Sequence, residues 1–179
     1  MDESLNRCLL VKPDVSMIEQ IAGYRAAFLA SGESMDGTGP LRRMEDPLEW
    51  LAFNRLAEQP ETKPDNWVPS EQFALLRESD RKIVGMTQFR HEFNDFLREF
   101  GGNIGYSVHP DERKKGYAKR MLTECLKVCK AFGLERVLIT CLVENEASRR
   151  TILSCGGVYD KTVYCERDNV HLERYWIEL

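Results

Sequence analysis

The segment that most restricts the possible folds runs from Ile104 to Phe132, where a strand pattern, a short polar loop and an amphipathic helix pattern follow one another. The apolar strand pattern ends at Val108, and Pro110 cannot continue it because proline lacks the N–H that a ladder needs. Apolar residues then recur at helical spacing, and Gly133 follows as a common helix terminator. This unit favours a fold in which helices pack on a sheet.

Over the whole chain of 179 residues, hydrophobic patterns predict four helices and seven strands. Helices are expected at about 14–30, 47–58, 116–132 and 145–155. Strands are expected at 8–11, 72–77, 82–90, 103–108, 136–143, 158–165 and 172–179. The second and third strands read as a hairpin, and the nearly continuous apolar run at 136–143 reads as a central strand covered on both faces. The order predicts one α+β domain over residues 1–179 with helices on a mixed sheet.

Composition excludes several classes of protein. Hydrophobic residues make up 42% and charged residues 30%, which is typical of globular domains and excludes disorder as the dominant state. The net charge of −4 argues against nucleic acid as a partner, because phosphate binding needs a basic surface. We see neither a secretory signal in MDESLNRCLLVKPD nor the 18 apolar residues of a membrane span, so no membrane partner and a cytoplasmic location are expected.

The six cysteines do not form a C-x-x-C pattern. Three of them, Cys125, Cys129 and Cys141, lie in strongly apolar segments, which favours buried thiols over a disulfide framework or a zinc site. No metal site is expected.

The loop that follows the 103–108 strand pattern is basic and carries a glycine where the helix begins. Arg113, Lys114 and Lys115 precede Gly116. A helix N-terminus presents unpaired N–H groups and a partial positive charge, so a diphosphate placed there gains hydrogen bonds. Glycine permits close backbone approach. A solvated basic loop before an ordinary surface helix is the alternative that these residues leave open.

Residues 113–118 read Arg-Lys-Lys-Gly-Tyr-Ala, ending in Tyr117 and Ala118, and resemble the (Q/R)-x-x-G-x-(G/A) pyrophosphate motif of the GNAT N-acetyltransferase superfamily. A second segment, beginning at Asn145 and Ser148, resembles the family's N-x-x-(A/S)-x-x-x-(Y)-x-x-x-G helix. Segments 41–51, 89–91, 101–106 and 174–177 resemble a subgroup described as predicted acetyltransferases. The resemblance therefore spans nearly the whole chain.

The resemblance implies transfer of an acetyl group from acetyl-CoA to a primary amine by direct attack in a ternary complex. It implies a mixed, mostly antiparallel central sheet of about seven strands flanked by about four helices, with the parallel strands 103–108 and 136–142 spread apart around the thioester. The backbone around Val108 would bond the pantetheine arm. The amides of Lys114, Lys115, Gly116, Tyr117 and Ala118 would cradle the pyrophosphate, with Arg113 at its entrance. Asn145 would contact the arm, with Ser148 nearby.

The sequence departs from the family where the catalytic tyrosine is expected, because Ile152 occupies that position. Either another group protonates the departing thiolate or the step needs no dedicated acid. His91 and Tyr106 are candidate catalytic residues, with a surface histidine and a core tyrosine as the alternatives. A covalent intermediate on Cys141 is conceivable, although a buried inert thiol is the favoured interpretation.

The acceptor is expected to be a small-molecule or peptide amine. Glu33 and Asp36 lie in the Gly-rich loop 31–40, which often shapes the acceptor pocket in this family, and they would favour a cationic amine there. Solvated loop carboxylates are the alternative. A homodimer is possible. A non-catalytic acyl-CoA sensor is the second hypothesis for function, and the absence of P-loop and G-x-G-x-x-G patterns disfavours an unrelated nucleotide binder.

Overall fold

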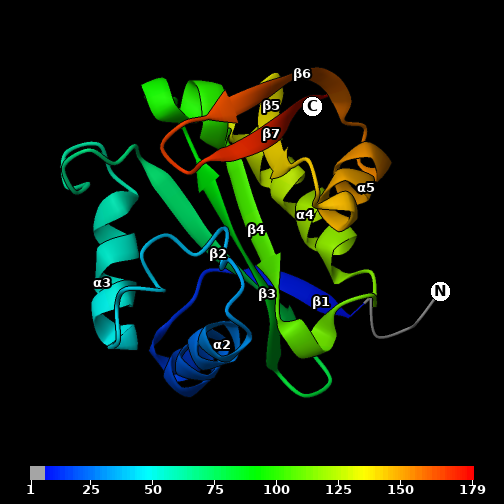
Figure 1. The fold of residues 1–179 in the computed structure, drawn as a ribbon. Helices are drawn as coiled ribbons and strands as arrows, with labels where there is room; N and C mark the ends of the chain where they lie inside the picture. The colour runs from blue at the N-terminus through cyan, green and yellow to red at the C-terminus, as the bar shows by residue number, and fades with distance from the viewer. Residues whose placement is uncertain (1–6) are drawn as a thin grey trace.

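The computed structural model describes residues 7–179, and its secondary structure follows the expected order (Figure 1). The strands are β1 (Cys8–Val11), β2 (Ser70–Arg77), β3 (Lys82–Arg90), β4 (Ile104–Val108), β5 (Arg136–Leu142), β6 (Val158–Cys165) and β7 (Val170–Glu178). The α-helices are α2 (Ile18–Ser31), α3 (Pro47–Ala57), α4 (Tyr117–Phe132) and α5 (Glu146–Ser154). The α+β class, the seven strands and the four main helices are therefore confirmed.

The strands form two sheets, with the orders β1-β2-β3-β4 and β5-β7-β6. Every hydrogen-bonded strand pair within residues 7–179 is antiparallel. The expected central sheet is thus divided between β4 and β5, and α4 makes the connection between these two strands.

Helices cover both faces of the four-stranded sheet. Successive side chains of a strand point to opposite faces, so those of β2 and β3 enter two different cores. Ala74 and Met86 pack with α2 and α3 in one core. Phe73 and Phe89 pack on the other face, in a core that includes α4, β5 and β7. β4 therefore lies where two cores meet and faces the second sheet along its open edge.

Glycines in the left-handed region bound α4, as the sequence predicts. Gly116 has φ +87° at the N-cap, and Gly133 has φ +106° at the C-cap, where its N–H reaches the last carbonyls of the helix. The apolar face of α4, which includes Met121 and Cys125, is buried. The helix thus points its N-terminus at the basic loop.

Some local features differ from the expected ones. The first helix begins with a 3₁₀ turn at Val15–Met17, which Asp14 caps. A π-helical turn at Leu97–Gly101 was not predicted and precedes β4. Short irregular turns of this kind leave no hydrophobic periodicity in the sequence.

Within residues 7–179, no helix is long and apolar enough to cross a membrane, and no group of three or more His, Cys, Asp and Glu side chains is arranged to hold a metal ion. Cys125, Cys129 and Cys141 are buried free thiols, as expected. Residues 1–6, which carry part of the segment considered for a secretory signal, lie outside the described residues.

Candidate active site

The edge of β4 that faces away from β3 presents backbone groups to the second sheet. The N–H of His109 donates to the carbonyl of Val84 at 3.0 Å, which makes this a hydrogen-bonded pair of the β3–β4 ladder. Because bonded and non-bonded pairs alternate in an antiparallel ladder, the N–H and C=O groups of Tyr106 and Val108 point away from β3. These are the groups expected to bond the pantetheine arm.

Asn103 joins the two sheets just before β4 begins. Its N–H donates to the carbonyl of Leu138 at 2.7 Å, and its side-chain Oδ1 accepts the N–H of Leu138 at 2.9 Å. Asn103 is only 3% exposed. Asn103 therefore bonds to both backbone polar groups of Leu138 in β5. Within residues 7–179, β4 and β5 are not paired as neighbouring strands of a sheet, so Asn103 marks the closed end of the opening between them.

A buried carboxylate anchors the loop between β4 and α4. Glu112 lies in a 3₁₀ turn and forms ion pairs with Arg77 at 2.8 Å, Lys82 at 2.8 Å and Lys115 at 2.9 Å. Burial acts to raise the pKa of Glu112, but the bonds from the three cations outweigh it and hold the pKa at about 2. The negative charge of Glu112 therefore keeps the basic loop in place at neutral pH.

The backbone after this anchor turns so that amides face outward at the start of α4. Lys114 has φ +61° and Gly116 has φ +87°, both in the left-handed region. Gly116 caps α4 without any side-chain hydrogen bond, so the first N–H groups of the helix are left for a ligand or water. Successive amides of this kind and the helix dipole form a binding site for an anion.

The side chains of the motif have different partners from one another. Tyr117 is 2% exposed and accepts a hydrogen bond from Arg77 at 3.0 Å, so only its backbone faces the site. Lys115 is bound to Glu112. Lys114 has no ion-pair partner among the residues that the structure describes, which leaves its charge available for phosphate.

Arg113 connects the cofactor loop to the Gly-rich loop 31–40. Its guanidinium pairs with Glu33, and its Nε donates to the carbonyl of Val108 at 3.4 Å. The hydrogen bond from the Arg113 guanidinium to the Glu33 carboxylate is the first cause of the lowered pKa of Glu33. A ligand group that bonded to the carbonyl of Val108 would compete with Arg113 for it.

Asp36 lies in the same loop and is exposed. Its backbone carbonyl accepts a hydrogen bond from Ser107 at 2.6 Å, and its carboxylate accepts one from Ser34 at 2.7 Å. The loop rests directly on β4, because a Cβ on Gly37 would lie 2.2 Å from the carbonyl oxygen of Gly105. Glu33 and Asp36 therefore lie near β4, but Glu33 is already paired.

The N-terminus of α5 faces β4 across the opening. Asn145 caps the helix through Oδ1, which accepts the N–H of Ser148 at 3.0 Å. The hydroxyl groups of Ser148 and Tyr106 lie 2.8 Å apart in a hydrogen bond. Tyr106 of β4 and Ser148 of α5 are thus in direct contact, and Val108 and Asn145 belong to the same two segments.

Burial raises the pKa of Tyr106 above its ordinary value, although the bond with Ser148 acts to lower it. Its hydroxyl therefore keeps its proton at neutral pH. Ile152 is fully buried in the apolar core one turn further along α5. Burial also raises the pKa of Cys141 to about 11, which makes the thiol a poor nucleophile.

The structure does not bring His91 to Tyr106. The His91 ring stacks on Phe132 with centroids 4.3 Å apart, and its Nε2 lies 3.3 Å from a carboxylate oxygen of Glu71. That bond is the first cause of the low pKa of Glu71, about 2. Phe132 ends α4, about 22 Å along the helix from Tyr117 at 1.5 Å per residue, so His91 lies near the helix end remote from the motif.

Sequence patterns missed two residues that shape the site, Asn103 and Glu112. The glycine pair 101–102 signals an unusual backbone before Asn103, but a pair of glycines does not reveal a bond to Leu138. Glu112 reads as part of an ordinary polar turn.

Comparison with known proteins identifies the family of this chain. Residues 43–156, well over half of the chain, match the model of the acetyltransferase (GNAT) family. A search of curated proteins finds no significant match. The chain belongs to the GNAT acetyltransferase family.

Several solved structures share the fold. The microcin C7 self-immunity acetyltransferase MccE, solved with acetyl-CoA and AMP, has a TM-score of 0.73 at 17% identity, covering 99% of this chain and 100% of that one. The ribosomal-protein-S5-alanine acetyltransferase from Vibrio fischeri has a TM-score of 0.70 at 17% identity, covering 96% and 93%. A GNAT-family acetyltransferase from Bacillus anthracis has a TM-score of 0.67 at 21% identity, covering 96% and 95%.

Proposed function

We propose that this protein transfers the acetyl group of acetyl-CoA to a primary amine by direct attack within a ternary complex. The single observation that carries the proposal is the combination of an anchored, outward-facing amide loop at the start of α4 with the open backbone edge of β4. GNAT acetyltransferases use acetyl-CoA as the acetyl donor, and this chain belongs to that family.

The residues present suit the parts of the donor. Outward amides from Lys114 to Ala118 and the unpaired charge of Lys114 suit the pyrophosphate. The backbone of Val108 and the side-chain amide of Asn145, whose Nδ2 is not used by the helix cap, suit the pantetheine arm. The thioester then lies near Tyr106, between β4 and β5.

The chemistry requires the amine nitrogen to form a bond to the thioester carbon while the carbon–sulfur bond breaks. The backbone N–H of Tyr106 faces the opening and can donate to the carbonyl oxygen as negative charge develops. The Tyr106 hydroxyl, held by Ser148, can give a proton to the departing thiolate. The proton that the amine loses passes to solvent.

The test is release of free thiol from acetyl-CoA, followed with a colorimetric reagent, across a panel of primary amines. Gly116→Glu is the matched variant, because it adds a negative charge and a side chain at a φ of +87°. Acceptor-dependent thiol release that this variant abolishes supports the proposal.

Calorimetry with acetyl-CoA separates the other outcomes. Tight binding of acetyl-CoA without transfer to any amine favours a non-catalytic acyl-CoA sensor, and absence of binding excludes both functions. Circular dichroism of Gly116→Glu establishes that the variant is folded before its activity is read.

A further inference from the structure

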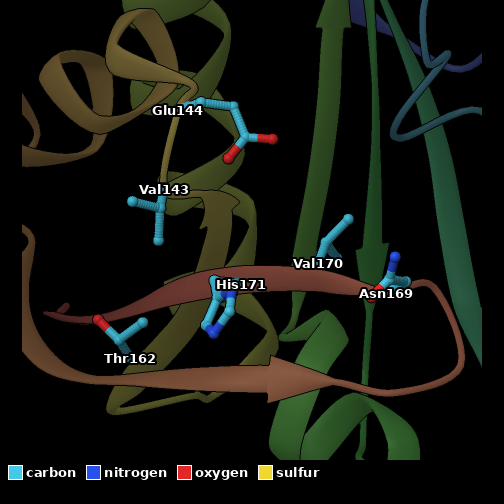
Figure 2. Close-up of a pocket in the computed structure, with 6 residues that line it drawn as sticks. All are labelled: Val143, Glu144, Thr162, Asn169, Val170 and His171. Carbon is cyan, nitrogen blue, oxygen red and sulfur yellow. The ribbon is translucent and has the colours of Figure 1, made fainter.

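A pocket of about 440 Å³ lies where β5 ends and β7 begins. Figure 2 shows the side chains that line it: Val143, Glu144, Thr162, Asn169, Val170 and His171. None of these residues was singled out by the sequence motifs. The lining contains one carboxylate, that of Glu144, and no lysine or arginine, although Arg149, which pairs with Glu173, also donates to the carbonyl of Val143.

The pocket adjoins the proposed position of the thioester. Val143 and Glu144 directly follow β5 and precede Asn145, the cap of α5. The N–H of Val143 donates to the carbonyl of His171 at 3.1 Å, which holds the two strand ends together. In Figure 2 the Glu144 side chain extends away from this connection, on the side of the view where the strands of the four-stranded sheet are drawn.

Glu144 differs from four glutamates that lie on the segments around the opening, because those four have cationic partners. These pairs are Glu33 with Arg113, Glu112 with Lys115, Glu146 with Arg150 and Glu173 with Arg149. Glu144 has no ion pair or side-chain hydrogen bond with any residue in the range 7–179. An unpaired carboxylate at the edge of a pocket is a binding group for a cation.

From these observations we infer that the pocket holds the acceptor, and that the acceptor is a dication whose second ammonium group binds Glu144. This inference rests on the proposed function. The attacking amine must be neutral when it reacts, so it gives no charge for recognition at that moment. A second ammonium group stays protonated throughout and can bind Glu144 while the neutral amine attacks the thioester. Aliphatic diamines and polyamines fit this description, as do lysine side chains next to another cation.

The experiment uses three acceptors with the same five-carbon chain and the same primary amine. The compounds are 1,5-diaminopentane, pentylamine and 5-aminopentanoate, whose far ends are positive, neutral and negative. The kcat/KM values are expected to fall in that order, by about fivefold per step after the twofold statistical factor of the diamine is removed. The advantage of the diamine is expected to shrink as NaCl is raised, because salt screens a partly exposed ion pair.

Glu144→Gln is expected to raise KM for 1,5-diaminopentane about fivefold with little change in kcat, and to remove the advantage over pentylamine. Glu178→Gln is the matched control, because Glu178 is an exposed carboxylate at the opposite end of β7 and does not line the pocket. The control is expected to retain the wild-type preference.

Equal kcat/KM values for the three acceptors, or a diamine advantage that survives in Glu144→Gln, would overturn the inference and leave the proposed function standing. Transfer to none of the three acceptors, with acetyl-CoA still bound, overturns it as well. Failure of acetyl-CoA to bind the wild-type protein is a separate result that removes the proposed function itself.

Discussion

The loop before α4 and the pocket after β5 differ in how firmly their charged side chains are held. In the loop, Glu112 is 4% exposed and has three cationic partners. In the pocket, Glu144 is exposed and has no ion-pair partner within the described residues. The proposed donor side thus has its buried carboxylate paired before any ligand binds, whereas the proposed acceptor side has one carboxylate without an ion-pair partner in residues 7–179.

The largest effect is expected when the anchor of the donor loop is removed. Glu112→Gln leaves Arg77, Lys82 and Lys115 close together without their shared negative charge, so the free energy of unfolding should fall by about 3 kcal/mol. Glu144→Gln, the same substitution in the pocket, should change it by less than about 0.5 kcal/mol. Urea unfolding at pH 7 measures both variants. Equal losses would mean that the two regions do not differ as described.

The pH dependence of the stability difference between wild type and Glu112→Gln provides a second test of the anchor. The pKa of Glu112 is lowered in the folded state to about 2, from an ordinary value of 4.5. A lowered pKa stabilises the fold above the unfolded value, and the stabilisation is lost as pH falls toward the folded value. The difference in stability between wild type and Glu112→Gln should therefore shrink between about pH 4.5 and 2. A difference that stays constant over this range would show that Glu112 acts through packing alone.

The next largest effect concerns the root of the opening. Asn103→Ala removes the acceptor of the buried Leu138 N–H, so we expect a loss of about 2 kcal/mol in urea unfolding. Glu178→Ala is the control, because Glu178 is exposed at the end of β7. A variant of Asn103 with wild-type stability would show that water replaces the lost bond and that Asn103 does not hold the sheets together.

Much of the fold follows from patterns in the chain. The apolar stripe of α4 and the glycines at its two ends define the helix, and the alternation within β2 and β3 defines the hairpin. These features are local, so single-sequence reasoning finds them. The separation of β4 from β5 is expected only from the family resemblance, and the link across its end is not local, because Asn103 bonds to Leu138, 35 residues further along the chain.

The site is divided in the same way. The proposed pyrophosphate loop is contiguous, and its residues 113–118 match the family motif in the sequence alone. The anchor Glu112 depends on Arg77 and Lys82, which come from the β2–β3 hairpin, and no spacing rule reveals that contact. His91 appeared suitable for catalysis from its residue type, but its neighbours Glu71 and Phe132 place it near the far end of α4. Residue type suggests a chemistry, and long-range contacts decide whether it is used.

A smaller effect is expected on the chemical step. Tyr106→Phe should lower kcat about tenfold with little change in KM for acetyl-CoA, because it removes the proposed proton donor. The loss is modest for an acid catalyst, since a thiol with a pKa near 8.5 departs as a fairly stable anion. Steady-state kinetics over pH 6–9 measure the effect. Ser148→Ala is the companion variant, which keeps the tyrosine hydroxyl but removes its partner. An unchanged kcat in Tyr106→Phe would show that the Tyr106 hydroxyl does not protonate the departing thiolate.

The smallest effect separates two neighbouring lysines of the motif. Lys114 has no ion-pair partner within residues 7–179, whereas Lys115 is tied to Glu112 at 2.9 Å. Lys114→Gln should weaken acetyl-CoA binding about threefold, with a weaker dependence on salt and no loss of stability, because its charge acts only on the ligand. Lys115→Gln should lower stability more than binding, because its charge serves the anchor. Calorimetry and urea unfolding on both variants test this distinction. If Lys114→Gln instead lowers stability and Lys115→Gln instead weakens binding, the ion pair of Lys115 with Glu112 does not hold the loop in the absence of ligand. The loop would then become ordered only when acetyl-CoA binds.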